Sequence, residues 1–151
     1  MRPHIVSIFI APDAGIPMQS VQQVLAMAGK GLQGDRYAEG KGSFNLVKGV
    51  GNRQVTFANE KFFRGPGFSP DESRRNIFTK DTELVGLIGK EFQIGKACFL
   101  GIEPCTPCDR PSQLIGTPFS FKLQFSDCGG LVAAVIADGI IRVGDDIIID
   151  I

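Results

Sequence analysis

The apolar runs of this chain are short, and most of them end at glycine or proline. The 151 residues hold 19 glycines and 9 prolines, and both residue types break helices. The last runs of the chain are rich in β-branched residues, which pack well in strands. Many short strands with frequent turns are typical of a β-barrel or a β-sandwich. We therefore expect a mainly β fold, with strands at residues 5–10, 54–57, 76–79, 91–94, 97–102, 131–136, 139–142 and 147–151.

The remaining segments connect these strands, and the chain is short enough to form a single domain over residues 1–151. Residues 59–63 and 81–87 fit short helices, whereas residues 18–28 fit either a strand or a short helix. Residues 29–51 contain seven glycines and are expected to form a long loop. A loop of this length in a compact domain is usually functional.

Charge and hydropathy exclude several classes of protein. The formal net charge is zero, which argues against nucleic-acid binding as the main role. The N-terminus lacks the apolar region of a signal peptide, and no run approaches the roughly 20 apolar residues of a membrane span. We expect a cytoplasmic protein without nucleic-acid or membrane partners. Residues 1–110 hold 14 of the 16 lysines and arginines, so an anion site is expected in that part of the chain.

Residues 105–108 form a Cys-Thr-Pro-Cys motif. Structural disulfides are rare in the cytoplasm, so these thiols are candidates for a reaction centre, metal ligands or buried packing. Arg110 would favour the ionised thiolate through its charge, and a thiolate is both a nucleophile and a soft metal ligand. A zinc site is an alternative, with further ligands from His4, Cys98 or Cys128. A thioredoxin-like redox pair is another, although that motif belongs to α/β proteins.

The glycine-rich loop contains Gly34, Asp35 and Arg36 in sequence. Glycine lets backbone N–H groups approach an anion closely, and an arginine can bind phosphate through two donors. Asp35 would orient Arg36 or accept hydrogen bonds from a ring N–H. Arg53, at the start of a predicted strand after the loop, would reach the same anion. The alternative for these charges is a solvated surface loop.

Residues 74–79 form a second polar cluster, Arg-Arg-Asn-Ile-Phe-Thr. In an extended strand, Arg74 and Arg75 point to opposite faces, so one of them is expected to face a given pocket. Asn76 can both donate to and accept from the edge of a heterocycle. The alternative is an exposed edge strand that charged residues protect from aggregation.

Taken in order, these segments resemble the MOSC domain family, named for the C-terminal part of molybdenum cofactor sulfurase. The chain is most similar to the small stand-alone bacterial members. One difference is Cys128, which stands where relatives often carry an arginine. The segments that carry the resemblance are residues 31–37, 53–56, 74–79, 87–95, 105–108, 129–131 and 141–147.

The resemblance implies a β-barrel fold that binds the molybdenum cofactor (molybdopterin), a pterin with a dithiolene and a phosphate. It implies that Cys108 carries sulfur as a persulfide or ligates molybdenum. Sulfur would come from a cysteine desulfurase or another pyridoxal-phosphate-dependent donor, and a molybdoenzyme or a redox partner would act with the protein. The alternatives are a molybdenum-dependent reductase of N-hydroxylated compounds with a separate electron donor, and a zinc or redox dithiol domain. The implied cofactor-binding residues are Gly34, Asp35, Arg36, Arg53, Arg75, Asn76 and Thr79.

Overall fold

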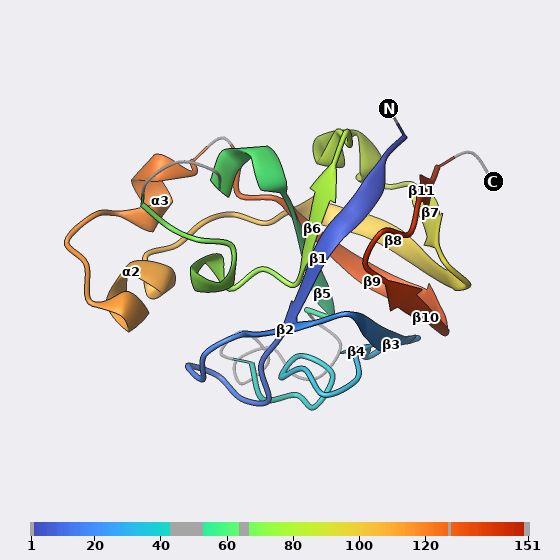
Figure 1. Cartoon of the computed structure of the whole chain (residues 1–151), viewed down its shortest axis with the longest axis horizontal. Helices are drawn as coiled ribbons and strands as arrows, with labels where there is room; N and C mark the ends of the chain where they lie inside the picture. Colours follow the sequence, from blue (N-terminus) through green and yellow to red (C-terminus); the bar gives the residue numbers. More distant parts are fainter. Residues whose placement is uncertain (1, 43–52, 64–66, 127, 150–151) are drawn as a thin grey trace.

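A computed structural model describes residues 2–42, 53–63, 67–126 and 128–149. Within these residues the strands form an eight-stranded sheet in the order β11-β7-β8-β9-β5-β6-β1-β2 and a three-stranded sheet in the order β10-β3-β4 (Figure 1). The strands of the larger sheet are β1 (His4–Ile10), β2 (Gln19–Val21), β5 (Val55–Asn59), β6 (Ile77–Lys80), β7 (Glu91–Ile94), β8 (Ala97–Pro104), β9 (Leu131–Ala137) and β11 (Ile147–Ile148). Those of the smaller sheet are β3 (Gln23–Met27), β4 (Gly31–Leu32) and β10 (Gly139–Arg142).

The mainly β class with a few short helices is confirmed. The undecided stretch 18–28 contains β2 and β3, and the short β4 lies inside the predicted loop 29–51. Residues 43–52 of that loop lie outside the described residues. The two predicted helical segments are present as short 3-10 helices. The helical segments are η1 (Glu60–Phe63), η2 (Asp71–Ser73), η3 (Leu84–Leu87), α2 (Arg110–Ile115) and α3 (Phe121–Gln124).

The larger sheet is not closed into a barrel by a continuous strand ladder, which corrects that part of the prediction. β1 pairs with β6 through residues 4–8 and with β2 through residues 8–10. These pairings leave only the start of β1 open toward β11. There, a single bridge joins His4 to Asp146, and the Ile147 N–H donates to the Pro3 carbonyl at 2.9 Å. The Ile5 N–H also donates to the Asp145 carbonyl at 3.0 Å, and the Gly144 N–H donates to the Ile5 carbonyl at 2.8 Å. Short backbone contacts, rather than a strand ladder, therefore span this gap.

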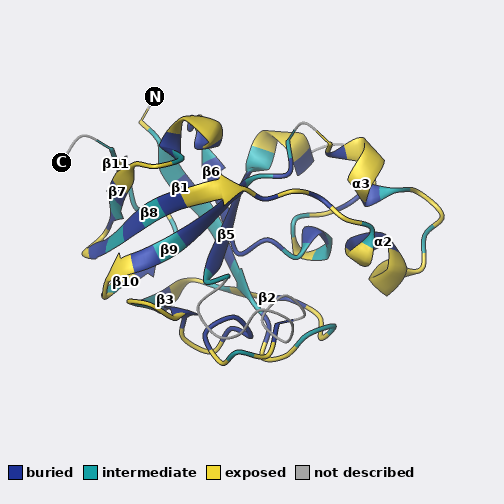
Figure 2. Ribbon diagram, turned by 180° about the vertical axis from the view of Figure 1, so that it is seen from behind, coloured by how far each residue is buried: buried dark blue, intermediate teal, exposed yellow. Residues whose placement is uncertain are grey.

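Two hydrophobic cores lie on opposite sides of β5, because successive strand residues point to opposite faces. Phe57 belongs to the main core, where its ring contacts Phe92 and Phe99 edge-on. Ala58 belongs to the second core, in which Phe63 of η1 stacks on Phe125 at 4.6 Å. This second core attaches the α2–α3 end of the molecule to the sheet (Figure 2).

No helix among the described residues has the length and apolar character to cross a bilayer.

Candidate functional site

A hollow of about 160 Å³ brings together the Cys-x-x-Cys segment and several basic segments. We call it the arginine hollow, because five arginines line it among the described residues. Four predicted site residues contribute to it: Cys108, Arg36, Arg53 and Arg75. The complete lining is Ala14, Gly15, Arg36, Tyr37, Arg53, Arg74, Arg75, Cys108, Arg110 and Pro111.

Arg36 is part of the scaffold of this hollow. It pairs with Asp35 at 3.0 Å, and the two side chains are 4% and 0% exposed, so the pair is buried rather than solvated. Its Nη1 makes this ion pair, and its Nη2 donates to the Tyr37 hydroxyl and to the Arg74 carbonyl, each at 3.1 Å. Asp35 thus orients Arg36, and Arg36 in turn holds the backbone at Arg74. Gly34 (φ +84°) supplies the left-handed turn before the pair, but neither Gly34 nor Asp35 lines the hollow.

Arg75 fixes the backbone around the Cys-x-x-Cys segment. Its Nε donates to the Gly129 carbonyl at 2.8 Å, and its Nη2 donates to the Cys105 carbonyl at 3.4 Å. Its Nη1 donates to the Ser73 carbonyl at 3.3 Å, and the guanidinium lies 5.5 Å from the centre of the Phe121 ring. Arg75 therefore lines the hollow while most of its donors are used by backbone carbonyls.

Arg74 also faces the hollow, although strand alternation predicts that Arg74 and Arg75 point apart. Arg74 follows η2 in the left-handed conformation (φ 67°), and β6 begins only at Ile77, so strand alternation does not apply here. Burial lowers the pKa of Arg74 to about 10, and repulsion from Arg36 contributes. In the sequence, Pro70 followed by the acidic Asp71 indicates a helix start. That signal could have placed Arg74 at the end of a helical turn rather than in a strand.

Arg53 and Arg110 complete the basic lining. Burial alone would lower the pKa of Arg53, but attraction to Cys105, Tyr37 and Glu103 raises it above its usual value. Arg110 begins α2, directly after the Cys-x-x-Cys loop. The sequence placed Arg110 near the thiol but did not count it among the binding residues.

The two cysteines of the motif face different surroundings. Cys105 is buried, and its N–H donates to the Gly130 carbonyl at 2.8 Å. Cys108 is exposed at the arginine hollow. Within the described ranges, no three His, Cys, Asp or Glu side chains gather as a metal site would require. Cys105 and Cys108 thus differ in exposure, whereas the zinc and dithiol alternatives give them equal roles.

The start of α2 is fixed by Asp109, the residue after Cys108. The Asp109 carboxylate accepts hydrogen bonds from the Ser120 hydroxyl at 2.6 Å and the Lys122 N–H at 3.0 Å. These bonds, the Ser120 bond first, lower the pKa of Asp109. They tie the loop that carries Cys108 to the start of α3.

Asn76 and Thr79 are not brought to the arginine hollow, because both side chains are used inside the sheet. The Asn76 Oδ1 accepts from the Thr56 N–H at 3.0 Å, and its Nδ2 donates to the Phe9 carbonyl at 3.1 Å. The Thr79 hydroxyl donates to Asn59 Oδ1 at 2.9 Å. Asn76 thus joins β1, β5 and β6, and no part of its side chain is open to a ligand at this site.

Comparison with known proteins gives one family and several related structures. The MOSC domain model matches residues 50–148, which include Cys108, Arg74 and Arg75. No match is found among curated proteins. The YuaD protein from Bacillus subtilis superposes with a TM-score of 0.80 at 18% identity, covering 97% of this chain and 94% of that one.

Two YiiM structures are similar as well. That from Escherichia coli has a TM-score of 0.71 at 14% identity and covers 100% of this chain and 70% of that one. That from Geobacillus stearothermophilus has a TM-score of 0.71 at 16% identity and covers 99% and 75%. At these identities the likeness shows the fold, and the family follows from the match of the family model, which covers about two thirds of the sequence. The chain belongs to the MOSC domain family.

Proposed function

We propose that the arginine hollow binds the molybdenum cofactor through its phosphate and that Cys108 carries sulfur to it. The observation that supports this proposal is the position of an exposed cysteine thiol in a hollow with five arginines, among the described residues. A phosphate is a strong hydrogen-bond acceptor, and arginine recognises it through paired donors. Cys108 and the arginines would thus contact one bound anion.

The residues present fit an anionic group. Burial and repulsion between Arg36 and Arg74 disfavour the charged state of Arg74, and a bound anion would relieve both effects. A volume of about 160 Å³ is below the range of about 300–1,000 Å³ for small-molecule sites. The hollow therefore suits the phosphate end of the cofactor rather than the whole pterin.

The proposed roles of the arginines differ. Arg74 and Arg110 would bind the phosphate, with Arg53 beside them, whereas Arg36 and Arg75 would hold the surrounding backbone. The bound cofactor would supply the molybdenum that accepts the sulfur.

Sulfur transfer needs an accessible thiolate, and Cys108 is exposed. In the proposed step, the Cys108 thiolate attacks the terminal sulfur of a persulfide on a pyridoxal-phosphate-dependent cysteine desulfurase. The donor's S–S bond breaks, its cysteine leaves as a thiolate, and Cys108 holds the persulfide. Direct ligation of molybdenum by Cys108 is the other outcome that the test separates.

The test measures bound pterin by fluorescence, bound molybdenum by mass spectrometry, and sulfur on Cys108 by peptide mass after anaerobic incubation with a desulfurase and cysteine. A sulfur carrier predicts that Cys108→Ser loses the added sulfur but keeps both pterin and molybdenum. If the Cys108→Ser variant also loses its molybdenum, Cys108 is identified as a metal ligand instead. Cys98→Ser is the control, because Cys98 lies on β8 away from the hollow.

The binding half of the proposal has its own variants. Arg74→Met combined with Arg110→Met should lose the pterin, whereas Arg142→Met, on the distant β10, should retain it. If the double variant retains wild-type amounts of pterin, the arginine hollow is not the binding site of the cofactor.

A further inference from the structure

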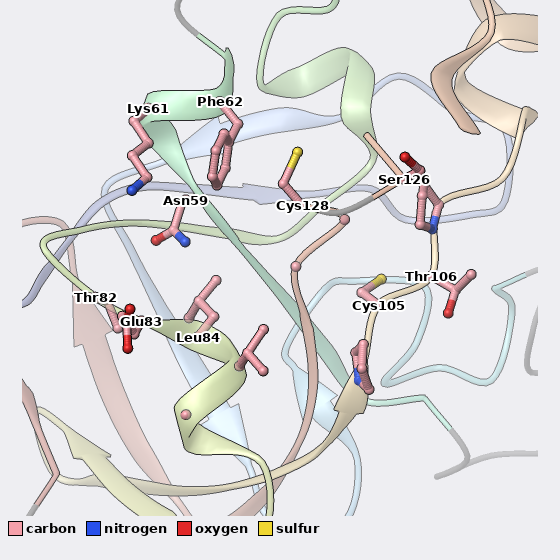
Figure 3. A pocket seen from close by; sticks show the side chains of 16 residues that line it. Asn59, Lys61, Phe62, Thr82, Glu83, Leu84, Cys105, Thr106, Ser126 and Cys128 are labelled. Atoms are coloured by element: carbon pink, nitrogen blue, oxygen red, sulfur yellow. The ribbon is translucent and has the colours of Figure 1, made fainter. Parts of the chain in front are cut away.

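A second and larger pocket, of about 610 Å³, shares the segment 104–108 with the arginine hollow. Within this segment, residues 104–107 line the larger pocket and Cys108 lines the hollow. No described residue lines both. Its volume lies within the usual range for small-molecule sites. Figure 3 shows its walls, with Lys61, Asn59 and Phe62 on one side and Glu83 and Leu84 on another.

Close backbone packing forms one side of this second pocket. Gly129 lies so near the Cys105 carbonyl that a Cβ there would approach the oxygen to 2.2 Å. Glycine at this position therefore brings two chain segments together behind the pocket and adds no side chain to it. Gly86 and Gly130 likewise line the pocket without side chains.

One part of the pocket presents donors for an anion. The Thr79 hydroxyl donates to Asn59 Oδ1 at 2.9 Å, so Asn59 Nδ2 is left to donate into the pocket. Lys61 lines the same wall, and its Nζ lies 5.2 Å from the centre of the Phe62 ring. In the described part of the chain, Lys61 forms no ion pair. An ammonium and an amide N–H therefore suit a carboxylate.

A facing wall supplies the opposite charge. Glu83 lines the pocket at the start of η3 and, like Lys61, forms no ion pair with another described residue. Its carboxylate is an acceptor for an ammonium group. Among the described lining residues, the pocket thus offers one cation, Lys61, and one anion, Glu83, which form no ion pair with each other.

The other described residues of the lining are uncharged and largely apolar. Phe62 is 41% exposed and Val85 is 69% exposed, although both are apolar and line the pocket. Leu84 lines the pocket as well, and the thiol-bearing residues Cys105 and Cys128 are also part of its lining. A ligand with an apolar body would cover these surfaces.

We propose that the second pocket binds a free α-amino acid with an apolar side chain. The ligand carboxylate accepts from Lys61 and Asn59, and its ammonium group donates to Glu83. Its side chain packs on Phe62 and Leu84. This site is separate from the proposed cofactor site, and neither proposal depends on the other.

The test is titration calorimetry of cofactor-free protein with L-leucine, 4-methylpentanoate and 3-methylbutylamine. These probes share the apolar body but carry both charges, only the carboxylate or only the ammonium. Leucine should bind with a dissociation constant of roughly 10 mM or tighter, as expected for a ligand of its size. Each one-charge probe should bind about tenfold more weakly, because it loses a charge-assisted hydrogen bond.

Variants then assign each charge to its partner. Glu83→Gln should weaken leucine about tenfold and leave 4-methylpentanoate unchanged. Lys61→Met should weaken both carboxylates and leave 3-methylbutylamine unchanged. Glu39→Gln and Lys96→Met are matched exposed controls outside the pocket.

A dissociation constant for leucine well above about 10 mM would overturn the proposal. Equal binding of leucine and the one-charge probes would overturn it as well. The readout uses neither Cys108 nor the arginines, so its failure leaves the cofactor proposal intact. Thermal unfolding of each variant confirms that a loss of binding is not a loss of folding.

Discussion

Replacing the buried carboxylate of Asp35 by an amide is expected to destabilise the protein strongly. Asp35 and Arg36 pair at 3.0 Å with almost no exposed side-chain surface. Asparagine keeps the shape and retains an acceptor for the N–H of Ala11, which bonds Asp35 Oδ1 at 3.0 Å. Asp35→Asn therefore removes the negative charge and leaves the Arg36 cation buried without its counter-ion. It also replaces Oδ2, which accepts from the Tyr37 N–H at 3.3 Å, by a donor.

Breaking a buried ion pair by removal of one partner costs about 3–5 kcal/mol. For a chain of this length, each kcal/mol of lost stability lowers Tm by about 2–4 °C, so Tm should fall by roughly 6–20 °C. Urea unfolding followed by circular dichroism measures the free energy of unfolding, and calorimetry measures Tm. Adding Arg36→Met to Asp35→Asn removes the orphaned charge and should recover part of the loss.

The surface pair of Arg2 and Asp146 is the matched control. Its atoms lie 3.2 Å apart, but its side chains are 83% and 38% exposed, and exposed pairs contribute at most about 1 kcal/mol. Asp146→Asn should therefore change the free energy of unfolding by no more than that. Equal losses for Asp35→Asn and Asp146→Asn would refute the reasoning, because burial would then make no difference.

Phosphate should raise Tm through the arginine hollow at pH 7, because an anion bound only by the folded state stabilises it. Burial lowers the pKa of Arg74 to about 10, so this rise should shrink as pH passes upward through about 10, and a constant rise up to pH 11 would contradict the assignment. Gly129→Ala places a Cβ 2.2 Å from the Cys105 carbonyl and should cost about 1–3 kcal/mol in urea unfolding, whereas Gly86→Ala, with open space around it, should not lower stability so much. Cys108→Ser should leave the urea midpoint unchanged because the side chain is exposed. Cys105→Ser buries a hydroxyl and should lower the midpoint. A lower midpoint for Cys108→Ser than for Cys105→Ser would contradict the assignment of Cys105 as the buried, structural cysteine.

The hairpin of β7 and β8 shows what could be predicted from the sequence. Apolar residues alternate on both sides of the Gly95 turn, and Phe92, Ile94, Ala97 and Phe99 are all buried in the structure. Local periodicity determines such an element, because a shift by one residue would expose the apolar set.

The two α-helices could not be predicted in this way. α3 contains only Phe121–Gln124, which is too short to be stable alone. Its stability comes from contacts with distant segments, since Phe121 meets Phe68 at 5.0 Å and Phe63 at 6.4 Å. No local pattern in the sequence reports these contacts.

The candidate site was predicted in its residue types more than in their roles. The sequence identified Arg36, Arg75 and Cys108, and all three line one hollow. It could not tell that the donors of Arg36 are taken by nearby protein groups, because one acceptor is the carbonyl of Arg74. Whether a polar side chain holds the fold or a ligand depends on such long-range backbone partners.

Arg75 shows why the two pockets are structurally linked although they share no lining residue among those described. It lines the arginine hollow, yet it donates to the carbonyls of Gly129 and Cys105, which both line the second pocket. Loss of this guanidinium would leave buried carbonyls without their charged donor. The walls of both pockets should then shift, whereas substitution of Arg74 or Lys61 should disturb only one pocket. Arg75 holds the start of the segment that carries Cys108, and it thus also supports the walls of the proposed amino-acid site.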